Sequence, residues 1–122
     1  RDGRWTLPGG WADLNESPAE SVRREVCEES EFSTRVVRLL AVYDKKKHTH
    51  PPHPYQAYKL FFLCELLGGE PRHSLETDGV EFFAEEEIPE LSSPRVTSGQ
   101  IARLFELHRH PDPAADFDRP GD

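Results

Sequence analysis

The chain has 122 residues, a length that supports one domain with a single core. Its formal net charge of −8 at pH 7 means that it lacks the broad basic surface of general nucleic-acid binders. No apolar run approaches the roughly 20 residues of a membrane span. Its only two cysteines, Cys27 and Cys64, are too few for a disulfide framework and lack metal-ligand spacing, so we expect a cytoplasmic domain with no nucleic-acid or membrane partner.

The first predicted element is a helix that follows Ser17. The segment 17–20 (SPAE) has the form of a capping box with proline at the first helical position. Ala19, Val22 and Val26 then recur at spacings of three and four residues. They form an apolar stripe that would dock the helix on a core.

The same helix would carry a concentration of negative charge. Glu25, Glu28 and Glu29 would share an arc of roughly 100°, where like charges repel one another. A hard divalent cation would turn this cost into a binding site. Arg24, four residues before Glu28, can pair with a carboxylate and orient it. The alternative is a solvated acidic face, and the helix taken alone favours that alternative.

The middle of the chain predicts strands separated by a polar loop. The strands are rich in aliphatic and β-branched residues and span residues 35–44, 55–67 and 80–84. The loop at 45–54 has three prolines among its last four residues, which excludes regular structure. Residues 85–91 predict a short turn or the opening of a helix.

The loop at 45–54 concentrates positive charge on an acidic chain. Its basic residues are Lys45, Lys46, Lys47, His48, His50 and His53. We expect the three lysines to bind a substrate phosphate as point charges, and an equally weighted alternative is a solvated loop. The histidine spacing also permits a zinc site, which the neighbouring prolines and the lack of further ligands disfavour.

The C-terminal part predicts one helix and a tail. Residues 96–108 carry apolar side chains at helical spacing, namely Ile101, Leu104, Phe105 and Leu107. The residues that follow are rich in proline and aspartate, and we expect them to be disordered. The chain is therefore divided into a domain at 1–109 and a disordered acidic, proline-rich tail at 110–122.

The residues around the first helix resemble the Nudix box, G-x5-E-x7-R-E-U-x-E-E-x-G-U, in which U is apolar. Gly10 and Glu16 are followed at the required spacings by the segment 24–29 (REVCEE) and by Phe32, and the segment 5–10 (WTLPGG) matches the usual lead-in. One position departs, because Glu31 stands where the family has glycine. That glycine normally adopts the left-handed conformation after a helix, so we expect either a longer helix or a strained turn, with the metal site preserved.

The resemblance implies an α/β fold, the Nudix α/β/α sandwich with a mixed sheet. It implies a Mg²⁺- or Mn²⁺-dependent pyrophosphohydrolase that splits a nucleoside diphosphate linked to another moiety, releasing a nucleoside monophosphate and a phosphorylated moiety. The segment 44–62 also resembles the subgroup that acts on ADP-ribose-like or CDP-choline-like diphosphates. The alternative is a non-catalytic Nudix module that senses a ligand or binds a partner.

The resemblance also assigns roles to residues. The predicted catalytic residues are Glu25, Glu28, Glu29 and Arg24, of which Arg24 is an orienting partner. The predicted metal-site residues are Glu25, Glu28, Glu29, the carbonyl of Gly10, Glu16 as a supporting carboxylate and, from outside the box, Glu76, with Glu81 as second choice. The predicted substrate-binding residues are Lys45, Lys46, Lys47 and, for stacking on a nucleobase, Trp5.

In the resembling fold, one or two strands precede the segment 5–10. The chain contains no methionine and begins only a few residues before this segment. We therefore expect a fragment of a longer protein that lacks its N-terminal strand or strands. The sheet edge left unpaired would favour a homodimer.

Overall fold

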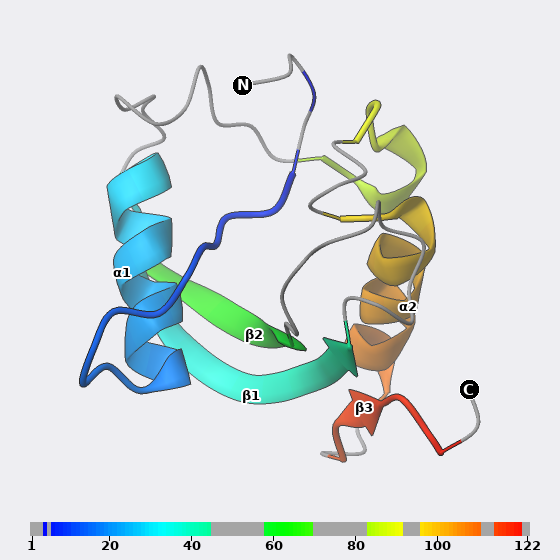
Figure 1. Ribbon diagram of the computed structural model, residues 1–122. Helices are drawn as coiled ribbons and strands as arrows, with labels where there is room; N and C mark the ends of the chain where they lie inside the picture. Colours follow the sequence, from blue (N-terminus) through cyan, green and yellow to red (C-terminus); the bar gives the residue numbers. More distant parts are fainter. Residues whose placement is uncertain are drawn as a thin grey trace.

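The computed structural model describes residues 4, 6–44, 58–69, 83–91, 96–110 and 114–120. Its elements are, in chain order, α1 (Pro18–Ser30), β1 (Ser33–Asp44), β2 (Tyr58–Gly68), the 3-10 helix η2 (Glu85–Glu87), α2 (Ser98–Arg109) and β3 (Asp116–Phe117). The sheet has the order β2-β1-β3, with β1 antiparallel to β2 and parallel to β3. This mixed sheet lies between α1 and α2 (Figure 1), as the sequence predicted.

Helix α1 begins where its capping signals place it. The main-chain N–H of Glu20 donates to Ser17 Oγ at 3.2 Å, and the N–H of Ser17 donates to Glu20 Oε1 at 2.9 Å. The apolar stripe of Ala19, Val22 and Val26 is half-buried. Arg23 Nε donates to the carbonyl of Thr34 at 2.8 Å, so α1 is tied to the start of β1.

The end of α1 shows which of the two outcomes expected at Glu31, a longer helix or a strained turn, is present. The helix stops at Ser30, and Glu31 adopts the left-handed conformation with φ 66° and ψ 11°. Its N–H donates to the carbonyl of Cys27 at 2.8 Å, which closes the helix in the way a glycine would. Gly69 (φ +103°) packs directly on this turn, where a Cβ would collide with the carbonyl oxygen of Glu31. The turn is therefore kept, with a strained residue in it.

We expect Glu31→Gly to raise the free energy of unfolding by about 0.5–1 kcal/mol. The substitution removes the left-handed penalty of about 1–2 kcal/mol, partly offset by the greater freedom of glycine in the unfolded chain. Urea unfolding would measure the change. Glu31→Ala is the control, because it removes the same carboxylate and keeps the Cβ. An equal gain in both variants would show that the side chain, and not the backbone, is responsible.

The core lies between the sheet and its helices. Its buried apolar residues are Phe32, Leu40, Ala41, Tyr43, Val96 and Ile101. The ring of Tyr43 on β1 packs against the ring of Phe61 on β2 with centroids 5.9 Å apart, a tilted arrangement that aromatic pairs favour.

Within the described residues, no helix is long and apolar enough to cross a membrane.

The C-terminal segment corrects one expectation. Residues 116 and 117 form β3 beside Ala41 and Val42, so disorder is wrong for these residues. The Tyr43 hydroxyl donates to Asp116 Oδ2 at 2.5 Å, and Arg103 Nε donates to the same oxygen at 3.2 Å. Burial and the hydrogen bond to Asp116 raise the pKa of Tyr43, so the hydroxyl stays a donor. A carboxylate held by two partners fixes the segment to the sheet.

Most other element predictions agree with the structure. Both long strands are present, β1 beginning two residues earlier than expected, and α2 begins at Ser98 after a capping box made by Thr97 and Gln100. The short helical turn expected after residue 84 is η2. For the strand expected at 80–84, Phe83 and Ala84 are not in a strand, and 80–82 lie outside the described residues. The predicted loop at 45–54 lies outside them too.

Candidate functional site

The two glycines before α1 lie against its carboxylates. The N–H of Gly9 donates to Glu29 Oε2 at 2.9 Å. A Cβ at Gly10 would stand 2.8 Å from Glu25 Oε2, which is too close for any other residue without displacing that carboxylate. The absence of a side chain lets the main chain approach Glu25 this closely. The predicted contribution of Gly10 to the site is therefore compatible with its position.

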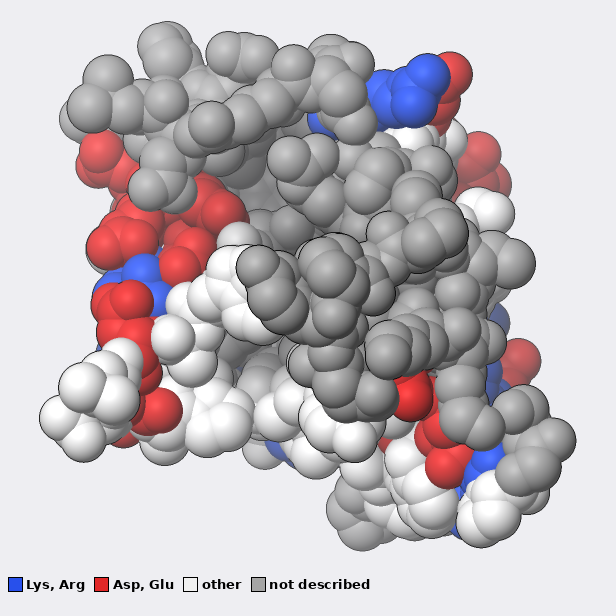
Figure 2. Space-filling view, viewed as in Figure 1, with Lys and Arg blue, Asp and Glu red and all other residues white. Residues whose placement is uncertain are grey.

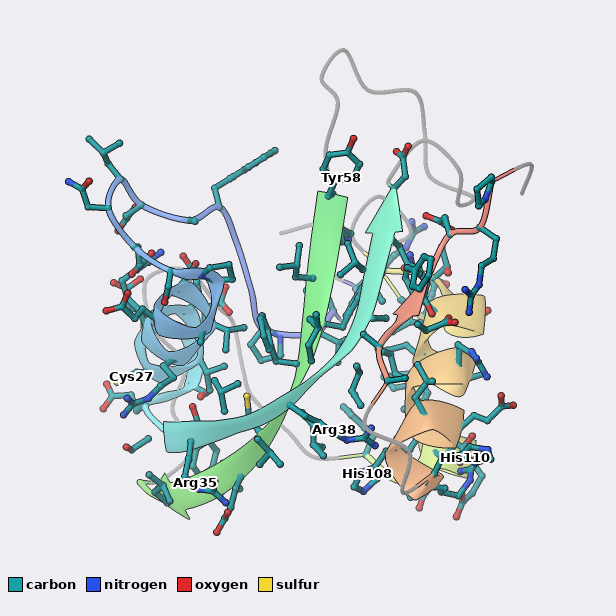
Figure 3. The ribbon with its side chains drawn as sticks, turned by 90° about the horizontal axis from the view of Figure 1, so that it is seen from below. Cys27, Arg35, Arg38, Tyr58, His108 and His110 are labelled. Carbon is teal, nitrogen blue, oxygen red and sulfur yellow. The ribbon has the colours of Figure 1, made fainter. Side chains whose placement is uncertain are left out.

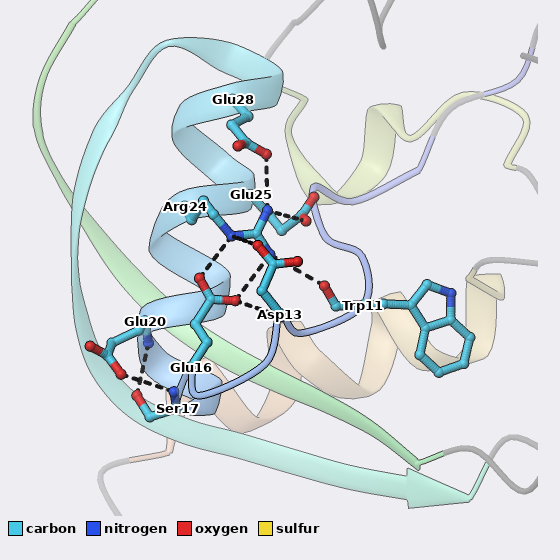
Figure 4. Close-up of polar contacts among 8 residues, drawn as sticks. All are labelled: Trp11, Asp13, Glu16, Ser17, Glu20, Arg24, Glu25 and Glu28. Carbon is cyan, nitrogen blue, oxygen red and sulfur yellow. Dashed lines mark hydrogen bonds and ion pairs between the residues drawn. The ribbon is translucent and has the colours of Figure 1, made fainter.

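Arg24 is the centre of an ion-pair network (Figure 4). Its Nη1 donates to Glu25 Oε1 at 2.7 Å and to Glu28 Oε1 at 2.9 Å. On its other side, Nε donates to Glu16 Oε2 at 2.7 Å and Nη2 donates to Glu16 Oε1 at 3.1 Å. A planar guanidinium can bind several carboxylates in fixed directions. Arg24 thus joins Glu16, from the loop before the helix, to two of the predicted ligands.

The loop between Gly10 and α1 is held by the same guanidinium. Arg24 Nη2 donates to the carbonyl of Trp11 at 3.3 Å, and Arg24 Nε lies 3.3 Å from Asp13 Oδ2. The N–H of Asp13 donates to Glu16 Oε1 at 2.9 Å. Sequence reasoning missed Trp11 and Asp13. The sequence feature that could have indicated them is their position among the five residues between Gly10 and Glu16. These five residues must fold back on α1 for Glu16 to reach Arg24.

The network fixes the charges of its members. The hydrogen bond from Arg24, followed by that from the N–H of Asp13, lowers the pKa of Glu16 to about 2. The hydrogen bonds to Glu16 and Glu25 in turn raise the pKa of Arg24. Figure 2 shows the acidic side chains gathered over α1. Opposite charges at hydrogen-bond distance favour the ionised form of both partners, so Glu16 and Arg24 stay charged at neutral pH.

The carboxylates differ in their access to solvent. The side chains of Glu16 and Glu25 are 14% and 12% exposed, whereas that of Glu28 is 49% exposed. Both oxygens of Glu16 are bound by Arg24, which suits the supporting role predicted for it. Glu28 presents its carboxylate to solvent at the edge of the network.

The residue types at this site fit a hard divalent cation. The candidate donors are oxygens of Glu25, Glu28, Glu29 and the carbonyl of Gly10, the kind of ligand that Mg²⁺ prefers. Within the described parts of the chain, no three His, Cys, Asp or Glu side chains are grouped so that they could hold a metal ion as they stand. Arg24 and the N–H of Gly9 take up oxygens of these carboxylates. Binding an ion would therefore require these side chains to rearrange.

The remaining site residues cannot be placed. Outside the described residues lie Trp5, Lys45, Lys46, Lys47, Glu76 and Glu81. Their predicted roles in binding the metal and the substrate stay predictions.

Comparison with known proteins identifies the family. The family model described as NUDIX domain matches residues 1–105. The chain belongs to the Nudix family. It is 45% identical over 117 residues to a Bacillus subtilis (strain 168) protein provisionally named ADP-ribose pyrophosphatase YjhB, an alignment that covers 96% of this chain and 56% of that protein. This Nudix chain spans about half the length of the curated relatives it matches.

Solved structures show the same fold. The crystal structure of an ADP-ribose pyrophosphatase from Streptococcus suis 89-1591 is 35% identical with a TM-score of 0.82, and the match covers 96% of this chain and 84% of that chain. The crystal structure of a UDP-X diphosphatase is 34% identical with a TM-score of 0.85, covering 96% of this chain and 57% of that chain. The Nudix box and the Nudix fold predicted from the sequence are therefore confirmed.

Proposed function

We propose that this Nudix chain carries the hydrolytic site of a Mg²⁺- or Mn²⁺-dependent pyrophosphohydrolase. The substrate is a nucleoside diphosphate linked to another moiety, ADP-ribose-like or CDP-choline-like, and the products are a nucleoside monophosphate and a phosphorylated moiety. The observation that carries the proposal is the close approach of Gly9 and Gly10 to the carboxylates of Glu29 and Glu25. The names of the relatives, which include ADP-ribose pyrophosphatase, favour the ADP-ribose-like class.

Each residue has a separate task in this proposal. Glu25, Glu28 and Glu29, with the carbonyl of Gly10, would hold the metal ion. A bound divalent ion would neutralise charge on the diphosphate and lower the pKa of the attacking water. Arg24 binds Glu25 through Oε1, and Oε2 is the oxygen nearest to the position of a Cβ at Gly10. The guanidinium therefore orients the carboxylate toward the glycine segment.

Several finer expectations belong to the same proposal. We expect Lys45, Lys46 and Lys47 to bind a phosphate, and Glu76 to add a carboxylate from outside the box. We also expect a homodimer and a cytoplasmic location. Sedimentation of the protein at several concentrations would test the dimer.

We expect the full-length protein with Mg²⁺ to release AMP from ADP-ribose. The decisive experiment incubates it with ADP-ribose, CDP-choline, NADH, dinucleoside polyphosphates and nucleoside triphosphates and identifies the nucleotide released. EDTA should abolish release, and added Mg²⁺ or Mn²⁺ should restore it, because the charge on the diphosphate is then neutralised again. Binding of these compounds without release of a nucleoside monophosphate would instead identify a non-catalytic ligand-sensing module.

A further inference from the structure

We infer that Trp11 stacks on the nucleobase of the substrate, an inference that rests on the function proposed above. Trp11 directly follows Gly10 and precedes the capping residues of α1. The Nudix box fixes no residue at this position, which lies within its first variable stretch. Trp11 would therefore contribute to substrate binding from a position that the box itself does not fix.

The main chain at Trp11 is fixed, while its ring is free of the fold. Arg24 Nη2 donates to the carbonyl of Trp11 at 3.3 Å, and Nη1 of the same guanidinium binds Glu25 and Glu28. Trp11 is nevertheless 69% exposed, and its indole ring points away from α1 and from Arg24 (Figure 4). The main chain of Trp11 is thus held at a fixed position relative to the carboxylates, and the faces of the indole ring are open to a ligand.

This exposure is costly for a tryptophan. Aromatic side chains contribute 150–250 Å² of apolar area each when they are buried, and tryptophan is highly buried on average. Only the main-chain carbonyl of Trp11 is bound to Arg24, the residue that also binds the charged side chains of Asp13, Glu16 and Glu28. An apolar ring at this place adds little to the core. A ligand that covers the ring would account for its position.

The reach of the ring matches the shape of the substrate. Consecutive Cα atoms are 3.8 Å apart, so Trp11 begins one residue from the glycine that contacts Glu25. In a nucleoside diphosphate, one sugar separates the base from the phosphates. The base of a diphosphate bound at Gly10 and Glu25 would be one sugar away, a separation that the side chain of the adjacent Trp11 can span. Every base has a π-face, so stacking here provides affinity with little choice between bases.

In the described part of the chain, Tyr58 is the next most exposed ring after Trp11, ahead of Phe117. It is 64% exposed, and it lies at the start of β2, away from α1 (Figure 3). Around it, Tyr58, Val42, Asp44, Phe117 and Asp118 line a hollow of about 240 Å³. No contact connects this hollow to Glu25 or Arg24 among the described residues. Trp11 is the exposed ring that shares a hydrogen-bond network with the carboxylates.

The test is the binding of AMP in the presence of Mg²⁺, followed by tryptophan fluorescence. The emission of Trp11 is the difference between the unaltered protein and Trp11→Phe, and we expect AMP to quench this difference while ribose 5-phosphate, which lacks a base, does not. Trp11→Ala should raise the Kd for AMP about 10-fold, whereas Trp11→Phe, which keeps an aromatic face, should stay within about 3-fold. Leu14→Ala is the matched control, because Leu14 lies on the same loop and is 91% exposed.

The outcomes separate this inference from the proposed function. If ADP-ribose is hydrolysed and Trp11→Ala leaves the KM and the Kd for AMP unchanged, the inference is wrong and the proposed function stands. If AMP quenches Trp11 without any hydrolysis, the proposed function fails and base stacking stands. Equal losses in Trp11→Ala and Leu14→Ala would overturn the inference, since they would point to the loop as a whole.

Discussion

Glu28→Gln and Glu29→Gln are each expected to lower kcat about 100- to 1,000-fold while the unfolding transition stays unchanged. Glutamine keeps the size of the side chain and one acceptor oxygen, so the hydrogen bond from Gly9 to position 29 can persist. What is lost is the negative charge that would hold the metal ion, and a single preorganised electrostatic contact contributes this much to a rate. Steady-state kinetics with ADP-ribose, together with thermal unfolding, would measure both effects.

Glu20→Gln is the matched control for these substitutions. Glu20 lies on the same helix, and its carboxylate accepts only the capping hydrogen bond from Ser17 among the contacts described. Glutamine serves equally well in a capping box, so this variant should keep full activity. Full activity in Glu28→Gln and Glu29→Gln would remove both residues from the metal site. A loss in all three variants would show that the charge of the helix as a whole matters.

The parts of the fold that depend on neighbouring residues could be predicted from the sequence. The cap of α1 is made by Ser17 and Glu20, three residues apart, and the aliphatic run that becomes β1 is continuous. Strand β3 could not be predicted, because Asp116 is held by Tyr43 and Arg103 from other elements. Its local composition of proline and aspartate favours disorder, and only the tertiary contacts overrule it.

Part of the candidate site could likewise be predicted from the sequence, and part could not. Helical periodicity was enough to place Glu25, Glu28 and Glu29 on one arc and Arg24 within reach of Glu28. The number of carboxylates that Arg24 binds was not predictable, because it depends on the path of residues 11–16 across the helix. The contact between Gly9 and Glu29 has the same origin. The spacing of the Nudix box thus encodes a loop that folds back on its own helix.

Arg24→Met is expected to lower both stability and activity at neutral pH. Without the guanidinium, Glu16 and Glu25 remain close together with little exposure and no cation between them, and Glu25 is no longer oriented toward Gly10. The loss should depend on pH. The hydrogen bond from Arg24, followed by that from the N–H of Asp13, lowers the pKa of Glu16 from 4.5 to about 2, so the stability that Glu16 contributes is complete above pH 4.5. It is lost as the pH falls from 4.5 to about 2.

Two measurements would check this expectation. An NMR titration of the Glu16 carboxyl should show its pKa returning toward 4.5 in Arg24→Met. Urea unfolding should show that the difference in free energy of unfolding between the unaltered protein and Arg24→Met narrows as the pH falls below 4.5. Arg24→Lys should be intermediate, because a single ammonium keeps the charge but cannot bind Glu16 and Glu25 in a fixed fork. A Glu16 pKa near 2 in Arg24→Met would mean that the N–H of Asp13 alone stabilises the carboxylate. Arg24 would then be needed for the acidic residues of α1 and not for Glu16.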